Sequence, residues 1–114
     1  MTNKTVSRLK KRFPGANVVN TYGPTESTCA ITEINVTDEI NEKYSPLPVG
    51  KPKDGTWIRI SDENGNAVVD GEKGEIVIIG DSVSIGYWNN AEKNKKILRT
   101  HNSKWRGIQI LQNR

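Results

Sequence analysis

The sequence is poor in the residue types that stabilise secreted and membrane proteins. Its 114 residues include a single cysteine, Cys29, which excludes an internal disulfide framework. No apolar run approaches the ~20 residues that span a bilayer. The residues that follow Met1 are polar and basic, unlike the apolar core of a signal peptide. We therefore expect a cytoplasmic protein that does not insert into a membrane.

Hydrophobic residues are scarce in the whole sequence, and acidic residues are scarce in its last part. The hydrophobic share is 33%, below the roughly 45–50% apolar share of ordinary domains, which predicts a small or incomplete core. The net charge of +4 is concentrated in residues 91–114, where seven Lys and Arg accompany one acidic residue. A basic tail of this kind is typical of a solvated segment, so we predict no nucleic-acid partner.

The first half of the chain predicts alternating helix and strand. Residues 2–13 place an apolar stripe (Val6, Leu9 and Phe13) on a basic helix that ends at a Pro-Gly pair. Val18 and Val19 predict a short buried strand, and 28–36 a second strand rich in β-branched residues. A short polar helix or turn is expected over 38–44.

The middle of the chain predicts a β-rich unit. Strands are expected over 57–61, 67–69, 75–79 and 82–85, with an Asn-Gly hairpin turn within 62–66. Residues 91–114 show no clear period, and no element is assigned there. This division predicts three parts: 1–45 as the end of an α/β subdomain, 46–90 as a partial β-barrel, and 91–114 as a disordered or frameshifted tail.

The segment Asn20–Glu26 carries the strongest chemical signal. Tyr22 offers an aromatic ring for stacking on a base, and Thr25 offers a hydroxyl to a phosphate. Glu26 offers a carboxylate suited to Mg²⁺ shared with phosphates, while Gly23 in a Gly-Pro turn lets the backbone approach a ligand. A nucleotide site is predicted, and a surface loop with an exposed tyrosine is the alternative.

The segment Asn20–Glu26 and three later blocks resemble the adenylate-forming, AMP-binding superfamily over about residues 6–93. The later blocks are Gly50-Lys51-Pro52, Asp62-Glu63-Asn64-Gly65, and 71–87 with its Gly-Glu-Lys-Gly-Glu start and Gly86-Tyr87 end. The residues 47–50 and 82–87 are most similar to the branch that activates D-alanine. The resemblance implies an α/β fold class, with this chain a fragment of the N-terminal domain: the end of an α/β layer followed by part of a β-barrel.

The resemblance also implies roles for individual residues. Tyr22 would stack on adenine with Asn20 near the base edge, Gly23 and Thr25 would contact ATP or AMP, and Glu26 would bind Mg²⁺. The parent reaction would join ATP and D-alanine into D-alanyl-AMP and transfer the D-alanyl group to a phosphopantetheine carrier protein, for teichoic acid D-alanylation. ATP and Mg²⁺ are the implied cofactors.

Other chemistry-bearing residues have weaker interpretations. Cys29 would lie where the family chain passes the amino-acid pocket, and an inert buried thiol is the alternative. A catalytic thiol is not expected, because no histidine or asparagine is placed to activate it. His101 is expected to be solvated, and Trp57 and Trp88 to pack in the barrel.

The sequence holds only one part of the machinery that the resemblance implies. It has no Ser/Thr/Gly-rich phosphate loop, no Tyr-x-Thr-Gly-Asp, and no domain with a catalytic lysine, so no catalytic residue is assigned and enzyme activity of this chain alone is uncertain. Asn89–Trp105 follows the family loosely, with Asn94 where threonine is usual. With one choice of codons, a one-base shift of Gly107–Arg114 spells Ala-Tyr-Lys-Tyr-Tyr-Lys-Thr-Gly, which predicts a frameshift near Trp105.

Two further hypotheses stay open at this point. The chain could derive from a peptide-synthetase adenylation domain or an acyl-CoA synthetase, or it could be a non-enzymatic β-rich interaction module. The oligomeric state is not indicated by any feature of the sequence.

Overall fold

The computed structural model describes residues 1–100 and 109–113, and the chain divides into two compact units. Unit 1 comprises Met1–Gly23 and Ala30–Lys53, and unit 2 comprises Pro24–Cys29 and Asp54–Arg114. The Asn20–Glu26 motif is therefore split between them, its first four residues in unit 1 and its last three in unit 2. Both units combine helix with antiparallel sheet, consistent with the predicted α/β fragment.

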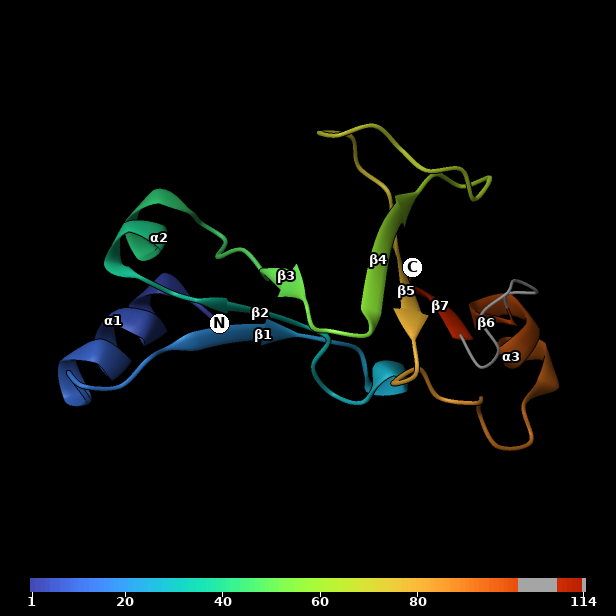
Figure 1. The fold of residues 1–114 in the computed structure, drawn as a ribbon, viewed down its shortest axis with the longest axis horizontal. Helices are drawn as coiled ribbons and strands as arrows, with labels where there is room; N and C mark the ends of the chain where they lie inside the picture. Colours follow the sequence, from blue (N-terminus) through green and yellow to red (C-terminus); the bar gives the residue numbers. More distant parts are fainter. Residues whose placement is uncertain (101–108, 114) are drawn as a thin grey trace. The chain divides into compact units, whose positions relative to one another are not determined.

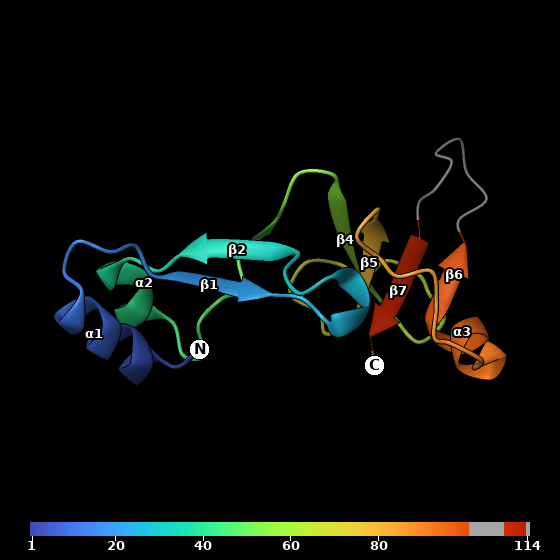
Figure 2. The ribbon, with the colours of Figure 1, turned by 90° about the horizontal axis from the view of Figure 1, so that it is seen from below.

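Unit 1 contains two helices and a three-stranded sheet. The helices are α1 (Asn3–Arg12) and α2 (Asp38–Lys43), which lie together beside one end of the β1–β2 pair (Figure 1; Figure 2). The strands β1 (Val19–Tyr22), β2 (Thr32–Asn35) and β3 (Lys51–Pro52) pair antiparallel in the order β1-β2-β3.

Each of the two helices begins directly after a threonine that caps its N-terminus. Thr2 accepts a hydrogen bond from the Thr5 amide, and Thr37 accepts one from the Ile40 amide. These hydroxyls satisfy amides that the first helical turn leaves without a partner. Three basic residues in the last turn of α1 oppose the negative end of its dipole. Both helices were predicted, and both are confirmed to within a residue or two.

A small apolar cluster holds unit 1 together. Its buried members are Val6, Val18, Val36 and Leu47, with Leu9, Ile34 and Ile40 packed against them. The predicted stripe of α1 is right for Val6 and Leu9 but wrong for Phe13, which is 54% exposed at the end of the helix. The prediction of a small core is borne out by this short list.

Unit 2 is built on a four-stranded antiparallel sheet. Its strands are β4 (Thr56–Ser61), β5 (Glu75–Gly80), β6 (Leu98–Thr100) and β7 (Gln109–Asn113), in the order β4-β5-β7-β6. The 3₁₀ turn η1 (Thr25–Ser27) and the helix α3 (Ala91–Ile97) complete it, and α3 lies beside β6 (Figure 2). Among the residues of unit 2 whose burial is described, Val77, Ile78 and Val83 are buried and apolar.

Several predicted strands differ from the observed ones. Residues 28–31 precede β2 rather than joining it, because Thr28 and Cys29 have left-handed backbone angles that a strand cannot hold. Residues 67–69 are not a strand: they make a bridge from Ala67 to Ser61 and a hydrogen bond from the Val68 amide to the Ile60 carbonyl oxygen. Residues 82–85 are not a strand but a turn region.

Two further expectations are corrected by the structure. Trp57 is 53% exposed and Trp88 is 98% exposed, so neither packs in a barrel core. Within 91–114, where no element was predicted, α3, β6 and β7 form. His101 and Trp105, the residues of the solvation and frameshift predictions, lie outside the described residues.

Gly50 occupies a position that only glycine fits, and Gly55 provides a matched comparison. Both have positive φ (86° and 77°), which costs an L-residue roughly 1–2 kcal/mol. A Cβ on Gly50 would also lie 1.9 Å from the Glu33 carbonyl oxygen, whereas a Cβ on Gly55 meets nothing within 4 Å. We predict that Gly50→Ala lowers the free energy of unfolding by more than about 2 kcal/mol and Gly55→Ala by only about 1.

Urea unfolding followed by circular dichroism, together with amide signals of each unit in NMR spectra, measures both variants. Equal losses for the two substitutions would show that the close approach of Gly50 to Glu33 does not constrain unit 1.

Candidate nucleotide-binding motif

Asn20 lies in the middle of β1 and is committed to the structure of unit 1. Its side chain is buried, at 5% exposure, and its Nδ2 donates a hydrogen bond of 2.7 Å to the Pro48 carbonyl oxygen. The strand predicted at Val18 and Val19 is shifted: β1 begins at Val19, which is 40% exposed, and continues through Tyr22. The amide therefore joins β1 to the Leu47–Gly50 segment, and its predicted place near a base edge stays a prediction.

Tyr22 is the last residue of β1 and is half-buried. It pairs with Thr32 of β2, and its carbonyl oxygen accepts a hydrogen bond of 2.8 Å from the Ile31 amide. Gly23 follows directly and ends this part of unit 1. The ring of Tyr22 thus projects from the end of β1, where pairing with β2 fixes the backbone of the residue.

Thr25 and Glu26 form the 3₁₀ turn at the start of unit 2. Pro24 precedes the turn in an extended conformation, and Thr28 ends it with a left-handed backbone (φ 60°). Ser27 is fully buried beneath the turn, where its Oγ donates to the Pro24 carbonyl oxygen at 3.1 Å. Thr25 is exposed, so its hydroxyl is accessible to a ligand.

The turn is tied to a distant segment of unit 2. The Ser84 amide donates to the Glu26 carbonyl oxygen at 2.6 Å, and the Thr28 hydroxyl donates to the Ser82 carbonyl oxygen at 2.9 Å. The resemblance implies a mainly structural role for residues 74–87. In the structure, residues 82–84 hold the turn of the motif, a contact between distant segments that no pattern in the sequence indicates.

Tyr87 adds a side-chain contact to the Glu26 carboxylate. Its hydroxyl donates a hydrogen bond to Glu26 Oε1, and Lys93 Nζ lies 4.0 Å from the centroid of the Tyr87 ring. This hydrogen bond, assisted by the charge of Lys93, holds the pKa of Glu26 below its usual value. The same bond raises the pKa of Tyr87, with burial and the negative charge of Glu26 adding to the effect.

The described residues contain no group of three or more His, Cys, Asp or Glu placed to hold a metal ion. A dedicated all-protein metal cage is therefore not present in that part of the chain. Mg²⁺ is commonly held by one or two carboxylates together with substrate phosphates, and the single, half-buried Glu26 fits this arrangement. Glu26 Oε1 accepts the hydrogen bond from the Tyr87 hydroxyl, so the orientation of the carboxylate is set by unit 2 itself.

Cys29 is exposed and has a left-handed backbone (φ 72°). The alternative of a buried inert thiol is therefore wrong. The prediction that Cys29 lines a substrate pocket stays a prediction.

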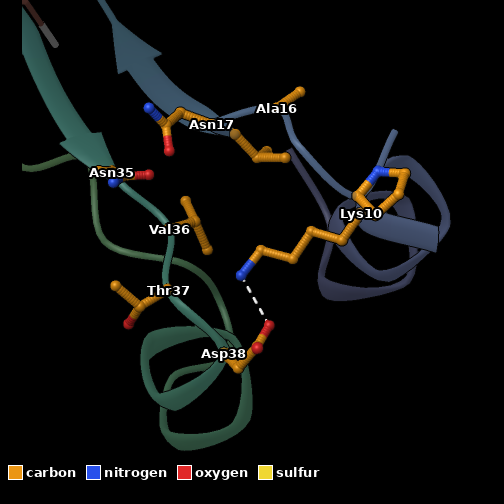
Figure 3. Close-up of a pocket in the computed structure, with 9 residues that line it drawn as sticks. Lys10, Ala16, Asn17, Asn35, Val36, Thr37 and Asp38 are labelled. Carbon is orange, nitrogen blue, oxygen red and sulfur yellow. Dashed lines mark hydrogen bonds and ion pairs between the residues drawn. The ribbon is translucent and has the colours of Figure 1, made fainter. Parts of the chain in front are cut away.

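The hollow shown in Figure 3 lies in unit 1, away from the motif residues. It has a volume of about 430 Å³ and is lined by residues of α1, α2 and the segments before β1 and after β2. Lys10 Nζ and Asp38 Oδ1 form an ion pair of 2.7 Å at its edge (Figure 3). None of the predicted site residues lines it.

Comparison with known proteins places the chain in a family. The family model described as AMP-binding enzyme matches residues 1–88. The chain belongs to the AMP-binding enzyme family. This confirms the resemblance that was read from Asn20–Glu26 and the blocks after it.

The relatives with high identity share one name. The chain is 52% identical over 96 residues to a D-alanine--D-alanyl carrier protein ligase of Lactiplantibacillus plantarum, covering 84% of the chain and 19% of that protein. It is 55% identical over 95 residues to the same-named protein of Bacillus licheniformis, covering 83% and 19%. The chain thus spans about a fifth of the length of these relatives.

Solved structures support the same fold. One is PA1221, an NRPS protein containing adenylation and PCP domains. The match has 30% sequence identity and a TM-score of 0.82, and it covers 99% of the present chain and 23% of the PA1221 chain. The match to VinN has 34% sequence identity and a TM-score of 0.77, and it covers 99% of the present chain and 26% of the VinN chain. The predicted fold class, an α/β fragment of an adenylation domain, is confirmed.

No helix among the described residues has the length and apolar character to cross a bilayer.

We predict that Tyr87→Phe raises the pKa of Glu26 toward its ordinary value, because the variant removes the main cause of the lowering. A lowered folded-state pKa stabilises the fold above the unfolded pKa, and this contribution is lost as the pH falls through the folded pKa. The variant should therefore lose less stability than the wild type on acidification. Carbon-detected NMR titration of the Glu26 carboxyl measures the shift.

Tyr44→Phe is the matched control, since Tyr44 lies in unit 1 and contacts Lys43 rather than a carboxylate. An unchanged Glu26 titration in Tyr87→Phe would mean that the hydrogen bond is not formed in solution.

Proposed function

We propose that this chain is a piece of a D-alanine-activating ligase that carries its AMP-binding motif. The observation that carries the proposal is the 52–55% identity to D-alanine--D-alanyl carrier protein ligases over most of the chain. In the parent reaction the D-alanine carboxylate attacks the α-phosphorus of ATP, and pyrophosphate leaves. The phosphopantetheine thiol of a carrier protein then attacks the acyl carbon, and AMP leaves.

The residues of the motif have distinct roles in this proposal. Tyr22 stacks on adenine from the end of β1, and Asn20 with Gly23 completes the wall on that side. Thr25, exposed on η1, donates its hydroxyl to the α-phosphate, where negative charge develops. Glu26 binds Mg²⁺, which would neutralise phosphate charge when present. Cys29 lies beside the pocket for the amino acid.

The chain alone is proposed to bind nucleotide weakly and to be inactive as a ligase. Adenylation depends on positioning several groups around the α-phosphate, and these 114 residues encode one set of them. Loss of a single such group commonly costs orders of magnitude in rate. The proposal places the protein in the cytoplasm, where ATP is available, and assigns the D-alanyl group to teichoic acid.

One alternative function has its own support. Adenylation domains of peptide synthetases are similar in structure, at 30% identity for PA1221, so a fragment of such a domain or of an acyl-CoA synthetase is the second candidate. The two differ in genomic context, and coding sequence upstream for a D-alanine pocket favours the first. A β-rich interaction module that binds no nucleotide is a third possibility, which the ATP titration below addresses.

We predict that ATP with Mg²⁺, titrated to millimolar concentration, shifts the amide signals of Tyr22, Thr25 and Glu26 in NMR spectra of the full chain. Tyr22→Ala should weaken this binding about tenfold, because stacking contributes roughly 1–3 kcal/mol per base. Tyr44→Ala is the matched control, as a second partly exposed tyrosine of unit 1. No shift at millimolar ATP, with or without Mg²⁺, would contradict nucleotide binding by this chain and leave an inactive fragment or the interaction module.

The frameshift hypothesis is tested by the coding DNA. A single-base shift near the codon for Trp105 should restore a Thr-Gly-Asp sequence downstream. DNA in which no single-base shift restores it would contradict the hypothesis.

A further inference from the structure

Asn94 holds the backbone of Tyr87 from both sides. The Tyr87 amide donates to Asn94 Oδ1 at 2.7 Å, and Asn94 Nδ2 donates to the Tyr87 carbonyl oxygen at 3.0 Å. A side-chain amide that both accepts from and donates to one residue satisfies that residue's backbone as a strand partner would. Asn94 is half-buried on α3, so the helix fixes the position of Tyr87.

We call the paired hydrogen bonds between Asn94 and the Tyr87 backbone the clamp, and the neighbouring residues fit it closely. A Cβ on Gly86 would lie 2.9 Å from Asn94 Nδ2, so a glycine is needed for the amide to approach. The positive φ of Gly86 (144°) also favours glycine. Lys93, beside Asn94 on α3, places its ammonium 4.0 Å from the centroid of the Tyr87 ring. Tyr87 is thus held by α3 through two independent contacts, Asn94 on its backbone and Lys93 on its ring.

The clamp ends at the carboxylate of Glu26. Tyr87 donates its hydroxyl to Oε1, 61 residues away in sequence, while the Ser84 amide binds the Glu26 carbonyl oxygen. Main chain and side chain of Glu26 are therefore held by the same segment, 84–87. Carboxylates that bind metal ions are commonly oriented by hydrogen bonds of this kind, and loss of the donor typically lowers metal affinity about 10–100-fold.

We propose that Tyr87 and Asn94 are positioning residues for the Glu26 carboxylate: Asn94 fixes Tyr87, and the Tyr87 hydroxyl orients the Glu26 carboxylate for binding a divalent cation. This inference rests on the proposed function, which assigns Glu26 to Mg²⁺. It adds α3 to the site, although the motif that binds the nucleotide lies more than sixty residues earlier. Asn94 stands where threonine was expected, and it makes both backbone contacts with one amide group.

The test uses Mn²⁺ as the probe and the full 114-residue chain. Paramagnetic broadening of the Glu26 amide signal is followed as MnCl₂ is added, without nucleotide. The concentration that halves the signal should rise about tenfold or more in Tyr87→Phe and in Asn94→Ala. Asn94→Thr, which keeps a donor and an acceptor on a shorter side chain, should recover part of the loss. Tyr44→Phe should match the wild type.

The outcomes separate the inference from the proposed function. If Mn²⁺ broadens Glu26 equally in the wild type, Tyr87→Phe and Asn94→Ala, the positioning role is overturned while Glu26 remains a metal ligand. If Mn²⁺ does not broaden Glu26 even in the wild type, the metal-binding role falls and the inference falls with it. Amide signals of Val77 and Ile78 report whether a variant keeps the fold of unit 2, and the two Asn94 variants decide the question if Tyr87→Phe unfolds.

Discussion

The attachment of the Pro24–Cys29 turn to residues 82–87 is the constraint on which unit 2 depends. Two hydrogen bonds to backbone carbonyls, from the Ser84 amide and the Thr28 hydroxyl, join segments more than fifty residues apart. Closing a loop of that length costs conformational entropy, so the contacts must be supported by packing, and Ser27 is fully buried beneath the turn. Within the turn, the Ser27 and Thr28 amides bond to the Pro24 and Thr25 carbonyl oxygens, and the attachment fixes this turn to the rest of unit 2.

The same attachment gives the turn its chemistry. Because the segment after β5 returns to the turn, Tyr87 reaches the Glu26 carboxylate and α3 reaches Tyr87. A carboxylate that accepts a hydrogen bond from a fixed donor stays ionised at a lower pH than a free one. The motif therefore does not act alone: its acidic residue depends on the glycine-tyrosine pair that ends the later block and on a helix that follows that block.

The small core explains why such polar contacts matter in this chain. Unit 1 has four buried apolar residues in its cluster, and several large apolar side chains elsewhere are exposed, Ile85 and Trp88 almost completely. Hydrophobic burial supplies most of the stabilisation of ordinary domains, and eight apolar side chains are buried among the residues whose burial is described. Hydrogen bonds such as Asn20 to Pro48 and Asn94 to Tyr87 therefore hold segments that a larger core would hold by packing.

Local sequence determined the elements whose signals are local. The helices α1 and α2 follow from a capping threonine and an apolar period, and β4 and β5 from β-branched runs bounded by turns. The Asn20–Glu26 motif and the blocks after it identified the family. Each consists of residues close together in sequence, so it can be recognised without knowing which distant segments it contacts.

Tertiary structure alone decided which segments meet. It placed β7 between β5 and β6, left 67–69 as a bridge, and made residues 82–87, where a strand was predicted over 82–85, a segment that supports Glu26. A strand partner or a hydrogen bond to a residue sixty positions away depends on which loops close. That choice is made by the packing of the whole unit, and no local pattern carries it.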